Sequence, residues 1–86
     1  MQIIYTPKAK EQLDYWVKTG NKPVLKKILQ LTNAIMESPY EGIGKPEPLK
    51  HELTGYWSRR ITKEHRYVYA IAEDTLIVAS LKGHYE

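Results

Sequence analysis

The sequence contains an acid, a base and several cations that could act together on a phosphodiester. Glu47 lies in a segment rich in glycine and proline, and His84 follows an apolar, strand-like run near the end of the chain. Arg60 and Arg66 lie between them, and Lys50 lies close to Glu47. RNA can be cleaved by its own 2′-hydroxyl group when a base takes the hydroxyl proton, an acid protonates the leaving oxygen and positive charge stabilises the phosphate. These residue types therefore point to RNA cleavage without a metal.

Each of these residues suits one role in that reaction. A glutamate is ionised at neutral pH, so Glu47 could accept the hydroxyl proton. An imidazole is protonated in a useful fraction of molecules, so His84 could donate a proton to the leaving 5′-oxygen. Arg60 and Arg66 could bind phosphate oxygens through parallel N–H groups, and Lys50 could add a point charge.

Aromatic residues add a possible contact for bases. The chain has seven Tyr and two Trp but no Phe, so most of its aromatic side chains carry a polar tip. Tyr85, together with Tyr56 or Trp57, could stack on a base or form a hydrogen bond with a phosphate. The alternative is that these side chains fill the edge of a small core.

The same residues also have ordinary structural explanations. Glu47 could be a solvated residue of its loop, and His84 could lie in a frayed terminus. Arg59 and Arg60 could form a solvated sheet edge whose charges oppose aggregation. The three histidines lack the spacing of metal ligands, and no phosphate-binding glycine loop or nucleophile elbow is present. We therefore expect no metal and no cofactor.

Composition sets the class of protein. With 86 residues, 42% hydrophobic and 27% charged, the chain is typical of one soluble globular domain, which we expect to span residues 1–86. The net charge of +3 is compatible with a polyanionic partner but is weak support alone. The absence of cysteine, of a signal peptide and of a long apolar run favours the cytoplasm and no contact with a membrane.

The elements that must position these residues follow from periodicity and from helix-capping signals. Thr6 and Pro7 are typical of a helix start, and Gly20 is typical of a helix end. We expect an α+β fold with the order β-α-α-β-β-β, in which two helices pack on one face of a mostly antiparallel sheet. The expected order is a strand at 2–6, helices at 7–18 and 22–37, a loop at 38–48, and strands at 56–62, 65–72 and 75–83. Residues 49–53 could add a further short strand before these three.

Both expected helices carry an apolar stripe with the helical period, and we expect each stripe to face the core. The stripe of the first helix comprises Ala9, Leu13, Trp16 and Val17. The stripe of the second helix comprises Leu25, Ile28, Leu29, Thr32, Ile35 and Met36.

Long blocks of this sequence closely resemble the YoeB/Txe family of bacterial toxins, within the RelE-like superfamily. The resemblance covers nearly the whole chain, and its blocks occur at compatible spacing. They are Val24–Leu29, Glu41–His51, Leu53–Thr62, Glu64–Ala70 and His84–Tyr85.

The resemblance implies a ribosome-dependent endoribonuclease that enters the A site and cuts the mRNA codon there. It also implies a YefM-type antitoxin that binds and silences the toxin, and it is compatible with a homodimer. The family's general base corresponds to Glu47, its phosphate-stabilising arginine to Arg66 and its general acid to His84. Further family positions correspond to Lys50, Arg60 and Tyr85.

Two residues depart from the family pattern. Glu86 extends the chain beyond the His-Tyr pair with which family members usually end, and we expect its charge to lie in solvent. Tyr56 stands where Phe is common, which a half-buried or stacking position would tolerate.

Two other functions remain as alternatives. A toxin of the same superfold could act without catalysis, for example by inhibiting gyrase, or it could block the ribosome without cutting. The Glu47 and His84 pair argues against the first, because binding alone needs no acid and no base. The second predicts translation arrest that is unchanged by His84→Gln.

Overall fold

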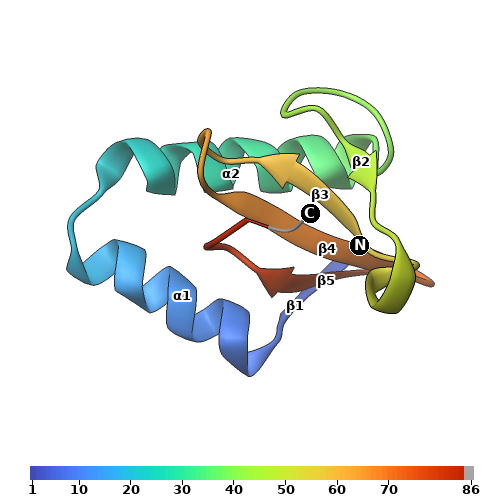
Figure 1. Cartoon of the computed structure of the whole chain (residues 1–86), viewed down its shortest axis with the longest axis horizontal. Coiled ribbons are helices and arrows are strands. Elements are labelled where there is room, and N and C mark those ends of the chain that lie inside the picture. Colours follow the sequence, from blue (N-terminus) through green and yellow to red (C-terminus); the bar gives the residue numbers. More distant parts are fainter. Residues whose placement is uncertain (85–86) are drawn as a thin grey trace.

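Two helices pack on a five-stranded sheet in this computed structural model, which describes residues 1–84. The strand order is β1-β5-β4-β3-β2, with β1 parallel to β5 and every other pair antiparallel. Figure 1 shows the short turn that joins the helices and the loop that leads from α2 to β2. The elements are β1 (Gln2–Tyr5), α1 (Pro7–Lys18), α2 (Lys22–Glu37), β2 (Glu47–Pro48), a 3-10 turn η1 (His51–Leu53), β3 (Trp57–Arg60), β4 (Arg66–Ala72) and β5 (Thr75–Ser80).

This architecture confirms the predicted α+β fold, and both helices have the predicted bounds. The Thr6 side chain accepts a hydrogen bond from the Ala9 backbone N–H at 3.1 Å, and Asn21 caps α2 by accepting from the Val24 N–H at 3.2 Å. Gly20 has a φ of 66°, which a residue without Cβ adopts at low cost, so the chain can turn directly from α1 into α2. None of the helices in residues 1–84 is long and apolar enough to span a membrane.

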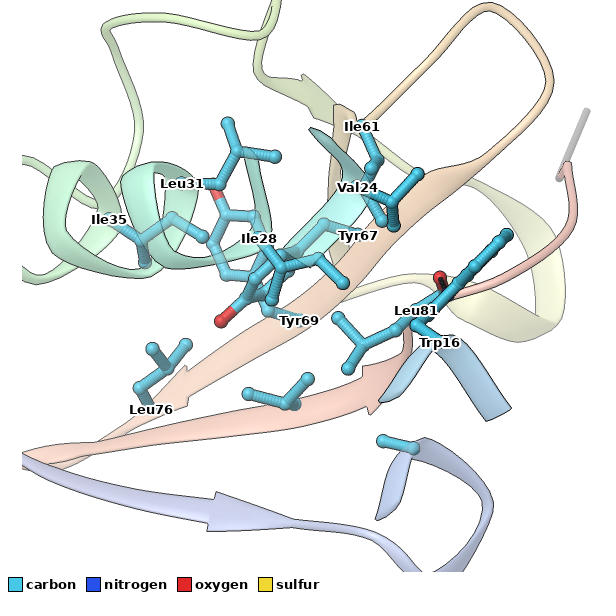
Figure 2. Close-up of a cluster of buried hydrophobic side chains, with 12 residues drawn as sticks. Trp16, Val24, Ile28, Leu31, Ile35, Ile61, Tyr67, Tyr69, Leu76 and Leu81 are labelled. Atoms are coloured by element: carbon cyan, nitrogen blue, oxygen red, sulfur yellow. Dashed lines mark hydrogen bonds between the residues drawn. The ribbon is translucent and has the colours of Figure 1, made fainter. Parts of the chain in front are cut away.

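The core lies between the helices and one face of the sheet (Figure 2). Leu31, Ile35 and Trp16 from the helices meet Tyr67, Tyr69 and other sheet residues in one buried cluster. The predicted stripes need two corrections, because Val17 is 57% exposed and Leu29 is 62% exposed.

Leu31, which the predicted stripe omitted, is fully buried. It lies three residues after Ile28 and four before Ile35, so it occupies the centre of their face. Leu29 follows Ile28 directly and is therefore rotated by about 100° away from that face.

The predicted strand at 49–53 is wrong. The pairing with β3 involves Glu47 and Pro48 instead, and residues 51–53 form the 3-10 turn. His51 has a φ of 59°, which ends the extended backbone, and the turn closes with a hydrogen bond from the Leu53 N–H to the Lys50 carbonyl at 3.1 Å. The consequence is that Glu47 belongs to a strand and faces β3 in a fixed register.

Candidate active site

A cavity with a volume of about 380 Å³ gathers side chains from the loop, three strands and the chain end. It brings together four of the predicted site residues: Glu47, Arg60, Arg66 and His84. Lys50 is not among the described residues that line it, and Tyr85 and Glu86 lie outside the described part of the chain. The lining residues are Lys45, Glu47, Leu49, Ser58, Arg60, Arg66 and His84.

The register of the sheet explains why these residues meet. Glu47 is directly opposite Ser58, and Arg60 is directly opposite Arg66. Side chains alternate along a strand, so Ser58 and Arg60 share one face of β3, while Arg59 points to the other face. Tyr67, next to Arg66, belongs to the core beneath the helices. The cavity is therefore on the face of the sheet opposite the helices.

Arg59 is fully buried, which excludes for this residue the alternative of a solvated sheet edge. Its Nη2 donates to the carbonyls of Ser38 at 2.6 Å and Glu41 at 3.0 Å, and Nη1 donates to the carbonyl of Ile43 at 3.2 Å. Its Nε donates to the Tyr69 hydroxyl at 3.2 Å. A buried guanidinium needs acceptors for its N–H groups, and here the loop backbone supplies most of them.

These bonds fix the loop that carries the first cavity residues. The Gly44 carbonyl accepts a hydrogen bond from the Arg60 N–H at 2.7 Å, and a Cβ at Gly44 would lie only 2.8 Å from Leu31 Cδ2. Gly44 therefore allows the loop to approach α2 and β3 closely. The next residue, Lys45, has a φ of 54°, which is uncommon for a residue with a side chain. That conformation places Lys45 in the cavity lining.

Arg66 is held with its guanidinium group fixed. It is 9% exposed, and its Nη1 donates to the carbonyls of Thr62 and Lys63 at 3.0 Å each and to that of His65 at 3.3 Å. Together with Arg60 and Lys45 it gives the cavity a positive character. Glu47 is the one carboxylate among the described lining residues. Fixed cations around one carboxylate suit a phosphate that gains negative charge.

The chain before His84 is anchored rather than frayed. Val68 pairs with Ser80 and Tyr69 pairs with Val78, so Ala79 is an extra residue at a β-bulge. Beyond β5, Leu81 is fully buried, and the Gly83 carbonyl accepts a hydrogen bond from the Arg66 N–H at 2.9 Å. His84 itself is exposed and lines the cavity, as well as a shallower depression that it shares with Lys63 and Glu64.

Sequence reasoning missed three lining residues. Ser58 could have been found, because it lies two positions before Arg60 on the same strand face. Lys45 and Leu49 gave no such signal, because their placement depends on how the loop folds back. No group of three or more histidine or acidic residues that could hold a metal is present in residues 1–84.

Comparison with known families gives a match over almost the whole chain. A family model described as the YoeB-like toxin of bacterial type II toxin-antitoxin systems matches residues 5–85. Toxin YoeB of Escherichia coli K12 is 47% identical over 85 residues, which cover 99% of this chain and 100% of the relative. Toxin YoeB of a Synechocystis strain is 53% identical over 74 residues, covering 85% of this chain and 86% of the relative.

Solved structures show the same fold. A YoeB/ParE toxin from Agrobacterium tumefaciens superposes with a TM-score of 0.95 at 38% identity, covering 99% of this chain and 100% of that one. The YoeB dimer from Staphylococcus aureus has a TM-score of 0.90 at 44% identity, and the YoeB-YefM complex from the same species has a TM-score of 0.89 at 45% identity. Each match covers 99% of this chain and 98% of the other chain.

Proposed function

Because this chain belongs to the YoeB-like toxins of bacterial type II toxin–antitoxin systems, we propose that it is a ribosome-dependent endoribonuclease that cuts mRNA in the A site. The observation that carries the proposal is the cavity in which one carboxylate, one imidazole and two arginines meet. The cavity's residue types match the needs of cleavage by the 2′-hydroxyl group and require no metal.

The reaction follows from the residues that line the cavity. Glu47 takes the proton of the 2′-hydroxyl group, whose oxygen then forms a bond to the adjacent phosphorus. The bond from phosphorus to the 5′-oxygen breaks, and His84 donates a proton to that oxygen. The products are a 2′,3′-cyclic phosphate on one fragment and a 5′-hydroxyl group on the other, and hydrolysis of the former yields a 3′-phosphate.

Arg66 is suited to stabilise the phosphate in the transition state. Three backbone carbonyls orient its guanidinium group before RNA arrives, so little reorganisation accompanies the reaction. Arg60 and Lys45 add charge from the same cavity. Lys50, which is not among the described lining residues, and Tyr85 have supporting roles in contacting RNA.

The remaining partners come from the family. Relatives from Staphylococcus aureus form a complex with YefM and a dimer. We extend both to this chain: a YefM-type antitoxin binds and silences it, and it can form a homodimer. Its other partners are mRNA and the small ribosomal subunit at the A site, and its place of action is the cytoplasm.

Cleavage on programmed ribosomes tests this function. A message with a start codon in the P site is incubated with the protein, and primer extension maps the cut. We expect a cut within the A-site codon by the unmodified chain and none by the Glu47→Ala/His84→Ala double variant, with both proteins checked for folding by circular dichroism.

Intact mRNA with the folded, unmodified chain would contradict the proposal, as would full cleavage by the double variant. A parallel supercoiling assay distinguishes the main alternative from mRNA cleavage, because loss of gyrase activity with mRNA untouched would identify a gyrase-inhibiting toxin. Translation arrest that His84→Gln leaves unchanged would identify a ribosome blocker.

A further inference from the structure

The segment 81–83, which leads to His84, is held by hydrogen bonds from two directions. From α1, Trp16 Nε1 donates to the Leu81 carbonyl at 2.9 Å, and Gln12 Oε1 accepts from the Leu81 N–H at 2.6 Å. From the position just before β4, His65 Nδ1 accepts from the Gly83 N–H at 3.0 Å. The Gly83 carbonyl is bound by the Arg66 N–H, so both polar groups of Gly83 are fixed.

The hydrogen bond at His65 Nδ1 determines the tautomer of the ring. An imidazole that accepts a hydrogen bond at Nδ1 is neutral and carries its proton on Nε2. The ring is half-buried and makes an edge contact with Trp16, with ring centroids 4.9 Å apart at an interplanar angle of 78°. Its own carbonyl accepts from the Ile61 N–H at 3.0 Å and from Arg66 Nη1. The ring is therefore held by Trp16 and the Gly83 N–H, and the His65 backbone is held by Ile61 and Arg66.

The conformational freedom of Gly83 explains why a clamp is needed at this point, namely the hydrogen bond from the Gly83 N–H to His65 Nδ1. Its φ of 93° lies in the region that glycine adopts freely, and nothing lies within 4 Å of the place where a Cβ would be. The residue immediately before His84 is thus held by hydrogen bonds rather than by side-chain packing. Loss of one bond would allow the backbone to rotate and would move the imidazole of His84 relative to the cavity.

We propose that His65 is a positioning residue: by binding the Gly83 N–H through Nδ1, it fixes the place of His84 in the cavity. The proposal rests on the proposed function, in which His84 protonates the leaving oxygen. A displacement of about 1 Å in a reacting group can cost about 100-fold in rate. His65 therefore acts through the next segment of the chain and not on RNA itself.

Two substitutions of His65 separate the hydrogen bond from the packing. His65→Asn keeps an acceptor close to the position of Nδ1, whereas His65→Gln moves the acceptor to about the position of Nε2. On programmed ribosomes we expect His65→Gln to lower kcat by about 10-fold to 100-fold and His65→Asn to retain it within about 3-fold, with KM little changed in either. Equal kcat for the two variants, whether normal or reduced, would overturn the proposal.

Two NMR measurements test the clamp independently of catalysis. In ¹⁵N-labelled protein, the imidazole shifts of His65 should be those of the Nε2–H tautomer, and an Nδ1–H tautomer would overturn the proposal. The Gly83 amide should exchange with solvent faster in His65→Gln than in His65→Asn. Equal exchange in the two variants would also overturn it.

One comparison separates the failure of this proposal from failure of the proposed function. It sets the unmodified chain against His84→Gln in the programmed-ribosome assay. If the unmodified chain leaves the mRNA intact, the proposed function fails, and if His84→Gln cuts at the full rate, the role of His84 as the acid fails. In both cases the tautomer and the Gly83 exchange still decide the clamp. If His84→Gln is inactive while the two His65 variants behave alike, the function stands and the clamp is wrong.

Discussion

At the scale of single residues, the core holds polar groups that are satisfied in specific pairs. The Tyr67 hydroxyl lies 2.7 Å from the Thr32 hydroxyl, which also donates to the Ile28 carbonyl at 2.9 Å. Tyr69 donates to the Pro39 carbonyl at 2.6 Å and accepts from Arg59 Nε. No buried side-chain nitrogen or oxygen in residues 1–84 lacks a partner. The core therefore depends on tyrosine hydroxyl groups staying protonated.

Alkaline pH should destabilise the fold through these tyrosines. Burial raises the pKa of Tyr67 well above its usual range, although the Thr32 hydroxyl opposes the shift, and burial raises the pKa of Tyr69 against the opposing effect of Arg59. A raised pKa in the folded state gives stability that is complete below the unfolded-state value of about 10 and is lost as pH rises above it. We expect the free energy of unfolding to fall steeply between pH 9 and pH 11.

Tyr67→Phe tests the assignment by urea unfolding at both pH values. The variant should lose about 1 kcal/mol less than the unmodified chain over this interval, because one titrating group has been removed. Tyr15→Phe is the matched control, since Tyr15 is 45% exposed. An equal loss in the Tyr67 variant and in this control would show that Tyr67 does not govern the alkaline transition.

At the scale of elements, local signals predicted the helices, whereas non-local contacts determine the path of the loop from α2 to β2. Thr6, Pro7 and Gly20 act within a few residues of their own positions, so the helix bounds could be found from the sequence alone. The path of the loop from α2 to β2 could not, because it depends on Arg59. Alternation along β3 puts Arg59 and Arg60 on opposite faces but does not tell which face a loop will cover.

The two adjacent arginines should separate stability from activity. Arg59→Met would leave the carbonyls of the loop and the Tyr69 hydroxyl without their donor, and we expect a loss of about 2–4 kcal/mol in the free energy of unfolding. Arg60→Met removes an exposed side chain, so its effect on stability should stay within about 0.5 kcal/mol while cleavage falls.

Urea unfolding and the programmed-ribosome assay measure the two effects on the same preparations. Hydrogen exchange of residues 40–45 adds a local readout, because these amides should lose protection in Arg59→Met alone. Equal stability of the two variants would mean that the contacts of Arg59 do not hold the loop.

At the scale of the whole molecule, the two faces of the sheet have different tasks. One face packs against the helices and supplies the core, and the other carries Ser58, Arg60 and Arg66 in the cavity. The order of the helices and of the strands other than β2 could be predicted, because each of these elements depends on its own period. The cavity could be predicted only in part. Glu47 reaches it through a two-residue strand, and Lys45 reaches it through an uncommon backbone conformation, neither of which leaves a periodic pattern.

The charge of the cavity, rather than the net charge of +3, should govern binding of single-stranded RNA. Each phosphate neutralised in single-stranded RNA contributes about −0.7 to the slope of log K against log salt concentration. Lys45→Met should reduce the magnitude of that slope by about 0.7 if Lys45 binds one phosphate, whereas Lys10→Met on α1 should leave it unchanged. The two variants lose the same charge, so they differ only in where it lies. Fluorescence anisotropy of a short labelled RNA at several salt concentrations measures the slopes, and equal slopes for the two variants would mean that net charge alone attracts RNA.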